Sequence, residues 1–272
     1  MVIEESFNPH RIKQKKLTER RESCLIIDAH AHIQELIGSS WNSPPERLIS
    51  LMDRAGIDKA IVMTYSDMPG SDSELLRYVA EATQEYPARL IGFARLNPGY
   101  GPLSEELLVL AITKMGMKGL KLHPVGYGIH PGNEVTIKLI KKAAEFNAPT
   151  LFHCGDEEYT LPLQIAEAAK KCSEATIILG HMGGYFHVQD AIRVAEKYPN
   201  IILETSAMPY PYLIRETVDR IGPERVLFAS DGPGCDPLLE RKKVELANLS
   251  KKEIELIFSE NIIKILEKVK KY

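Results

Sequence analysis

The sequence predicts a single (β/α)8 TIM barrel of the α/β class, preceded by a short polar extension. Two observations predict this fold. Short apolar runs rich in β-branched residues recur about every 25 to 35 residues, and the segments between them have helical periodicity. Near-continuous Val, Ile and Leu runs are typical of parallel strands covered on both faces. The chain has 272 residues, an ordinary length for one barrel. An open doubly wound sheet shares this alternation and is the alternative.

Residues 1–23 form the expected extension, since the stretch RIKQKKLTERRE at 11–22 is dense in charge and has almost no large apolar side chain. We expect a solvated tail or a polar helix on the surface. A basic contact for a partner is the alternative, although the interleaved glutamates weaken it. The barrel is expected over 24–272, because no interruption there is long enough for a second domain.

The eight expected strands are the apolar runs themselves. In chain order they are LIIDAHAH (25–32), KAIVMTY (59–65), RLIGFARLNP (89–98), KGLKLHP (118–124), PTLFHCG (149–155), TIILGHMGG (176–184), IILETSAM (201–208) and RVLFASDGPG (225–234). Helix start signals lie between them. Pro162 suits the first position of a helix. Ser250 and Glu253 can form a capping box ahead of the final helix.

Composition excludes several classes of protein. A net charge of −3 gives no sign of a nucleic-acid or anionic-membrane surface. No apolar run approaches the roughly 18 residues of a spanning helix, and residues 1–23 contain no apolar signal-peptide core. The four cysteines lie far apart, which argues against a disulfide scaffold or a thiolate zinc site. We therefore expect a cytoplasmic protein with neither nucleic-acid nor membrane partners. Barrel enzymes often assemble through outer helices, so a homodimer is the assembly we expect.

Metal-ligating residue types recur at the carboxyl ends of the expected strands. In the first strand, alternation places His30 and His32 on one face, with Asp28 below them. Lys121 and His123 end the fourth strand, and three further strands end in His153, His181 and Asp231. Barrel active sites are built at this end. The pattern predicts a divalent-metal site there. The alternative is a barrel that keeps hydrogen-bonded polar residues without using them.

These motifs resemble those of the amidohydrolase superfamily. The match consists of DAHAH (28–32), GLKLHP (119–124), ASDGP (229–233) and the histidines of LFHCG and LGHMGG. The chain looks most like the amidohydrolase-related branch, which includes aminocarboxymuconate semialdehyde decarboxylase, related aromatic-acid decarboxylases, and lactone or amide hydrolases. The closing SENIIKIL is also similar to the final helix of that branch. The resemblance covers residues 24–266.

The resemblance implies a ligand set of His30, His32, His153 and Asp231. It also implies that His181 is an acid/base or, in a two-metal site, a further ligand. Three imidazoles and one carboxylate suit Zn²⁺, with Mn²⁺, Fe²⁺ or Co²⁺ as less favoured occupants. We expect Asp231 to be catalytic as well, by accepting a proton from metal-activated water.

Lys121 has three interpretations, because a lysine inside an apolar strand is costly unless it is paired or modified. We expect Lys121 and His123 to bind an anionic group of the substrate. In some members of the superfamily, a strand-four lysine is carbamylated and bridges two metals. The third interpretation is an internal ion pair with an acid such as Glu204.

The favoured function is a metal-dependent hydrolase acting on an amide or lactone of a small molecule. In that reaction His181 would stabilise the developing oxyanion. A metal-dependent non-oxidative decarboxylase of a small carboxylic acid is the alternative. Decarboxylases of this branch often carry a glutamate at the first histidine of strand one, whereas this sequence has His30 there, which slightly favours hydrolysis. A non-catalytic binding barrel and a nuclease are weaker hypotheses.

Overall fold

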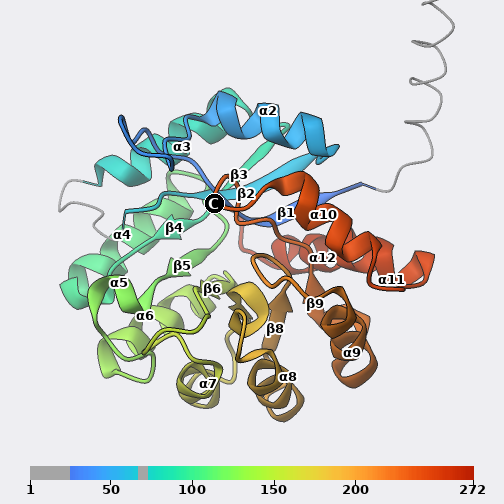
Figure 1. The fold of residues 1–272 in the computed structure, drawn as a ribbon. Helices are drawn as coiled ribbons and strands as arrows, with labels where there is room; N and C mark the ends of the chain where they lie inside the picture. The colour runs from blue at the N-terminus through green and yellow to red at the C-terminus, as the bar shows by residue number, and fades with distance from the viewer. Residues whose placement is uncertain (1–24, 67–72) are drawn as a thin grey trace, which may run out of the picture.

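The computed structural model describes residues 25–66 and 73–272, and the extension expected at 1–23 lies outside them. Its strands form the middle of the molecule and its helices surround them (Figure 1). The strands are β1 (Ile27–His32), β2 (Lys59–Met63), β3 (Leu90–Gly92), β4 (Ala94–Arg95), β5 (Leu120–Leu122), β6 (Thr150–Phe152), β7 (Ile177–Leu179), β8 (Ile201–Glu204) and β9 (Val226–Leu227). Every expected strand contains at least one of them.

All strand pairs are parallel and follow the order of the chain, in two sheets of β1–β3 and β4–β9. The third expected strand bridges the two sheets. It is divided into β3 and β4 at Phe93, whose backbone N–H still donates to the carbonyl of Val62 on β2. Gly92 and Ala94, on either side, bond to the segment before β5. The two sheets are therefore continuous through this strand.

Backbone hydrogen bonds join the first strand to the last and close the barrel. The N–H of Ala29 donates to the carbonyl of Phe228 over 3.0 Å, and the N–H of His32 donates to the carbonyl of Gly232 over 2.7 Å. An open doubly wound sheet would leave these strands as free edges. The predicted barrel is confirmed, and the open sheet is excluded.

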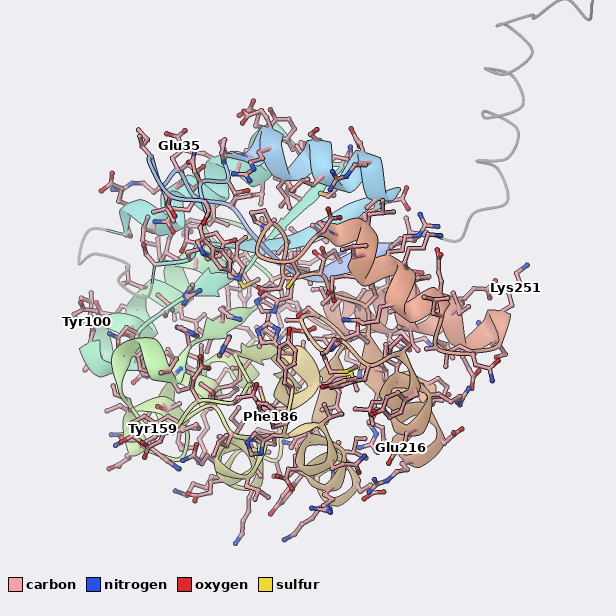
Figure 2. All side chains as sticks on the ribbon, in the orientation of Figure 1. Glu35, Tyr100, Tyr159, Phe186, Glu216 and Lys251 are labelled. Carbon is pink, nitrogen blue, oxygen red and sulfur yellow. The ribbon has the colours of Figure 1, made fainter. Side chains whose placement is uncertain are left out.

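Two of the surrounding helices begin at the signals named in the sequence. The helices are α2 (Pro45–Ala55), α3 (Glu74–Glu85), α4 (Pro102–Thr113), α5 (Pro124–Tyr127), α6 (Glu134–Glu145), α7 (Pro162–Lys171), α8 (Val188–Lys197), α9 (Pro211–Ile221), α10 (Pro237–Glu245), α11 (Lys251–Glu255) and α12 (Asn261–Glu267). Pro162 is the first residue of α7, and Ser250 and Glu253 form the predicted capping box of α11. Charged side chains such as Glu216 and Lys251 lie at the periphery (Figure 2). No helix among the described residues is both long and apolar enough to cross a bilayer.

The side-chain alternation of β1 shifts by one residue between Asp28 and Ala31. Ile27 and Ala29 belong to the inner apolar cluster, whereas Ala31 belongs to the outer core under the helices. The prediction that Asp28 shares a face with the two histidines is therefore wrong. A bulge of this kind, which re-aims the side chains that follow it, is common next to active sites.

Asp28 instead holds the seam of the barrel together. Its Oδ1 atom accepts hydrogen bonds from the N–H of Ser230, over 2.8 Å, and of His30, over 3.1 Å. The hydroxyl of Ser230 donates to Oδ2. Burial raises the pKa of Asp28 to about 7, although these hydrogen bonds oppose the rise. The carboxyl group thus ties the strand that carries His30 to the strand that leads to Asp231.

Candidate metal centre and active site

Three predicted metal ligands meet at one end of the barrel. His30 and His32 lie on β1, and Asp231 follows β9. The Oδ1 atom of Asp231 lies 3.1 Å from Nε2 of His32 and 3.5 Å from Nε2 of His30. One ligand atom of each residue lies within 4.8 Å of the others. We call His30, His32 and Asp231 the ligand triad, because they are close enough to share one ion.

The ligand triad has the donor atoms and the orientation that a divalent cation requires. Nδ1 of His30 lies 2.9 Å from the carboxylate of Glu204, and Nδ1 of His32 lies 3.1 Å from the carbonyl oxygen of Thr64. Since both acceptors take a hydrogen from Nδ1, the lone pair of each ring is left on Nε2, which faces Asp231. The site therefore fits a divalent metal such as Zn²⁺ or Mn²⁺.

Two residues of the site have a left-handed backbone conformation, which residues other than glycine rarely adopt. The φ angle is 56° at Asp231 and 58° at His181. Such a conformation costs on the order of 1 kcal/mol or more and persists only where the surroundings enforce it. At Asp231 the surroundings include a 2.7 Å hydrogen bond from its N–H to the carbonyl of His30.

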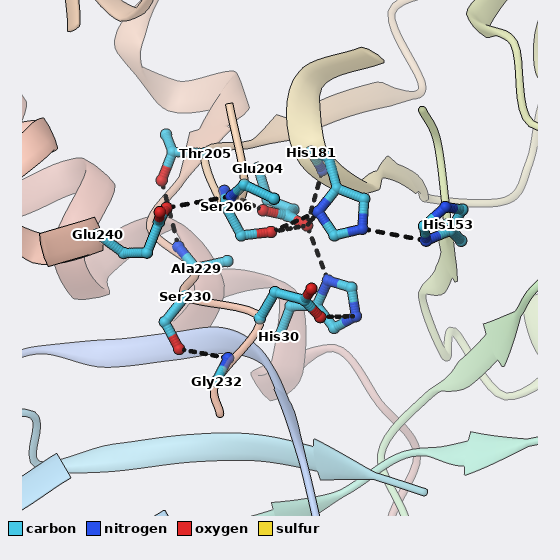
Figure 3. Close-up of polar contacts among 12 residues, drawn as sticks. His30, His153, His181, Glu204, Thr205, Ser206, Ala229, Ser230, Gly232 and Glu240 are labelled. Carbon is cyan, nitrogen blue, oxygen red and sulfur yellow. Dashed lines mark hydrogen bonds and ion pairs between the residues drawn. The ribbon is translucent and has the colours of Figure 1, made fainter. Parts of the chain in front are cut away.

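The other two predicted histidines lie beside the ligand triad and contact each other. Nε2 of His181 is 3.1 Å from Nδ1 of His153 (Figure 3). The ring centre of His181 lies 5.1 Å from that of His30. Nε2 of His153 lies 3.3 Å from a carboxylate oxygen of Glu157. Among the described residues, the groups of three candidate ligands whose atoms all lie within 4.8 Å of one another do not include His153. Three of the four predicted ligands thus converge, and His153 lies next to them.

Lys121 and His123 are placed where the sequence predicted them, at the carboxyl end of β5. Nζ of Lys121, whose side chain is 1% exposed, lies 2.7 Å from Nε2 of His30. The ring of His123 packs edge-on against that of His153, with 4.6 Å between their centres. Both residues line the same cavity as His32 and Asp231 of the ligand triad. Their predicted role, binding an anionic group, stays a prediction.

A cavity of about 200 Å³ opens directly over these residues. Its wall contains His32, Trp41, Tyr65, Arg95, Lys121, His123, His153 and Asp231. The rings of Trp41 and Tyr65 meet edge to face, and Tyr65 stacks on His32. Sequence reasoning missed Arg95. The available signal was an arginine inside an apolar run, because a buried charge is costly unless it is paired. Arg95 is 6% exposed and donates to the carbonyl oxygen of Thr64.

The electrostatics of the site favour neutral imidazoles around one carboxylate. Burial lowers the pKa of four histidines of the site, His30, His32, His153 and His181. For His153 the pKa falls to about 4. Burial opposes the ionisation of Asp231, but the contact with His32 and the positive charge of Lys121 hold its pKa below the usual range. Metal binding requires this combination of protonation states.

The amidohydrolase family model matches residues 27–268. The chain belongs to this family. The match spans every described strand, and the superfamily resemblance seen in the sequence is confirmed. No curated protein matches this amidohydrolase chain significantly in sequence.

Solved structures share the fold of this amidohydrolase. The 2,6-dihydroxybenzoate decarboxylase from Rhizobium is 15% identical, with a TM-score of 0.70 over 90% of this chain and 99% of that chain. The 5-carboxyvanillate decarboxylase from Novosphingobium aromaticivorans, complexed with manganese and 4-hydroxy-3-methoxy-5-nitrobenzoic acid, is 18% identical, with a TM-score of 0.72 over 90% and 96%. The dihydroxybenzoic acid decarboxylase from Polaromonas sp. JS666, with bound manganese and the inhibitor 2-nitroresorcinol, is 15% identical, with a TM-score of 0.71 over 90% and 97%.

Proposed function

We propose that this amidohydrolase is a metal-dependent, non-oxidative decarboxylase of a small carboxylic acid. The observation that carries the proposal is the pair of buried cationic side chains, Arg95 and Lys121, in the wall of the cavity beside the ligand triad. Cationic side chains in the wall of a cavity can form charge-assisted hydrogen bonds to the carboxylate of a bound substrate. The solved decarboxylases of the same fold support this alternative over the hydrolase that the sequence favoured.

The proposed metal ligands are His30, His32 and Asp231, with His153 as the fourth. When bound, a divalent ion supplies positive charge that polarises the carboxylated end of the substrate. Zn²⁺ suits a set of imidazoles with one carboxylate. Mn²⁺ is an equal candidate, since two solved decarboxylases of this fold contain manganese. We therefore extend the expectation of zinc to either ion.

The side chains of the cavity have distinct roles in the proposed reaction. Arg95 and Lys121 bind the substrate carboxylate and orient it. The bond between this carboxylate and the substrate carbon breaks, carbon dioxide leaves, and the electron pair stays on the carbon. Nε2 of His181 takes a proton from water, the hydroxide returns to solvent, and this proton forms the new C–H bond. Because burial lowers the pKa of His181, a proton taken up on this ring is readily passed on.

Removing the charge of Arg95 tests the proposal. Arg95→Met should raise the KM for an acid that the enzyme decarboxylates by about 10- to 100-fold, which is the effect of losing one charge-assisted hydrogen bond. Carbon dioxide release from a panel of small aromatic and aliphatic acids, with Mn²⁺ or Zn²⁺ added, is the measurement. Arg193→Met, the same change at an exposed ion pair with Asp190 on α8, is the matched control.

A hydrolase acting on an amide or lactone is the second candidate, because both ligand positions of β1 are histidines, His30 and His32. The same panel distinguishes the two functions when neutral amides and lactones are included. Turnover of neutral substrates, with no carbon dioxide from any acid and no effect of Arg95→Met, would replace the decarboxylase proposal with this one.

A further inference from the structure

Glu204, at the end of β8, is a buried carboxylate for which the proposed reaction has no use. Its exposure is 0%, and its carboxylate takes part in four hydrogen bonds. Oε1 lies 2.9 Å from Nδ1 of His30, 3.0 Å from the N–H of His181 and 2.9 Å from the hydroxyl of Ser206. Oε2 accepts the N–H of Ser206 over 2.6 Å. Glu204 thus lies between a metal ligand and the proposed proton carrier (Figure 3).

The direction of these hydrogen bonds follows from the atoms involved. Backbone N–H groups can only donate, so both oxygens of Glu204 are acceptors. Burial raises the pKa of Glu204 to about 7, and the hydrogen bonds from Ser206 and from the N–H of His181 oppose the rise by favouring the ionised carboxylate. An ionised carboxylate has no hydrogen of its own. His30 must therefore carry its hydrogen on Nδ1, and the lone pair of that ring is on Nε2, toward the ligand triad.

Ser206 passes the same constraint to His181. Its hydroxyl has one hydrogen, which goes to Glu204 over 2.9 Å. The oxygen of Ser206 is then an acceptor for Nδ1 of His181, 2.8 Å away. His181 consequently carries a hydrogen on Nδ1, and its Nε2 atom accepts the hydrogen on Nδ1 of His153, 3.1 Å away.

We propose that Glu204 is a positioning residue that sets the tautomers of both His30 and His181, the first directly and the second through Ser206. One buried carboxylate thereby presents the Nε2 atoms of a metal ligand and of a proton carrier together. Partners of this kind fix the tautomer and orientation of ligating histidines. The inference rests on the proposed function in taking His30 as a ligand and His181 as the proton carrier.

A second metal ion held by His30, His181 and Glu204 is the competing interpretation, since suitable atoms of these residues also lie within 4.8 Å of one another. Glu204 favours positioning, because its oxygens are already occupied by hydrogen-bond donors. A metal there would have to displace the hydrogen on Nδ1 of His30. The number of Mn²⁺ ions bound per chain separates the two interpretations.

The first test uses the metal-free wild-type protein and needs no substrate. Two-bond ¹H–¹⁵N spectra of the imidazoles report which nitrogen carries the hydrogen, and with eight histidines in the chain the signals can be assigned by single variants. His30 and His181 should both be in the Nδ1–H form at neutral pH. The Nε2–H form at either residue would overturn the proposal.

The second test separates the two branches of the network. Glu204→Gln places an amide NH2 group among hydrogen-bond donors, and should lower Mn²⁺ affinity about 10- to 100-fold. Ser206→Ala should leave Mn²⁺ affinity within about twofold of the wild type, since the bond between Glu204 and His30 remains, but lower kcat about 10-fold or more and release His181 from its single tautomer. Thr205→Val is the matched control, because its hydroxyl accepts only from the N–H of Ala229 in the described network.

The outcomes also separate this inference from the proposed function. Wild-type Mn²⁺ affinity in Glu204→Gln, or two Mn²⁺ ions per wild-type chain, would overturn the positioning role. Equal loss of Mn²⁺ affinity in Ser206→Ala and Glu204→Gln would do the same, because a general collapse of the loop would then explain both. Expected tautomers and metal affinities without any carbon dioxide release would overturn the decarboxylase and leave the positioning role supported.

Discussion

Asp231 combines three properties that bear on its role. It is the carboxylate of the ligand triad, its pKa is held below the usual range by His32 and the positive charge of Lys121, and its backbone is left-handed. Asparagine adopts this backbone more readily than most residues. Asp231→Asn should therefore fold normally, whereas Mn²⁺ affinity and turnover should each fall about 100-fold, as for a lost charged ligand. Titration calorimetry with Mn²⁺ measures the first.

The matched control for this variant is Asp190→Asn on α8, which breaks surface ion pairs with Arg193 and His187. The control should bind Mn²⁺ like the wild type. Normal turnover by Asp231→Asn would remove Asp231 from the active site.

Single residues differed in how well the sequence predicted them. The histidines and Asp231 were found because ligating types recur at strand ends, a pattern that needs only the order of the chain. Arg95 was missed, since one charge in an apolar run carries no spacing signal. Asp28 was assigned to the wrong face, because alternation along a strand gives no warning of an irregularity such as the one after Asp28.

At the scale of elements, α11 shows a stability effect that depends on pH. Glu253 receives two hydrogen bonds from Arg215 of α9, each 3.0 Å long, and accepts the N–H of Ser250 as well. The bonds to Arg215, followed by that of Ser250, lower the pKa of Glu253 from 4.5 to about 2. A carboxyl group whose pKa is lower in the folded state stabilises the fold above its unfolded pKa. The stabilisation is lost as the pH falls from about 4.5 to about 2.

Glu253→Gln isolates this ion pair, since glutamine can also complete a capping box. The variant should be less stable than the wild type by about 0.5–1 kcal/mol at pH 7, a small value because the pair lies at the surface. The difference should shrink toward zero as the pH falls toward 2, in urea denaturation at a series of pH values. Glu267→Gln, on an exposed part of α12, is the control. A difference that persists unchanged at low pH would contradict the assignment.

Elements were predicted well in kind and order, and less well in extent. Each apolar run contains a strand, because β-branched runs between helical segments have few other structures available. The third run became two strands, β3 and β4, interrupted at Phe93, and several others are shorter than their runs. Strand ends depend on which backbone groups find partners across the barrel, and a single run of sequence does not contain that information.

At the scale of the whole molecule, the hydrogen bonds that close the barrel between β1 and the segment after β9 also hold the residues of the ligand triad together. Metal should then bind to a folded protein and stabilise it by mass action. Mn²⁺ at 100 times its Kd should contribute about 2.7 kcal/mol and raise Tm by about 5–10 °C. The double variant His30→Ala/His32→Ala should keep its helical circular dichroism and lose this response to metal. Scanning calorimetry with Mn²⁺ and then with a chelator measures it.

Unfolding of the metal-free protein at room temperature would contradict a preformed site. Closure itself could not be read from the sequence, because an open sheet and a barrel share the same alternation of strands and helices. The bonds between β1 and the segment after β9 decide between them, and they join residues about 200 positions apart in the chain.

The left-handed backbone at His181 and Asp231 has a consequence for how this protein can change. Glycine at either place would relieve the unfavourable torsion and delete the functional side chain in the same step. At these two positions a substitution that raises thermal stability removes the functional side chain. Relatives that no longer catalyse the reaction can therefore accept glycine there.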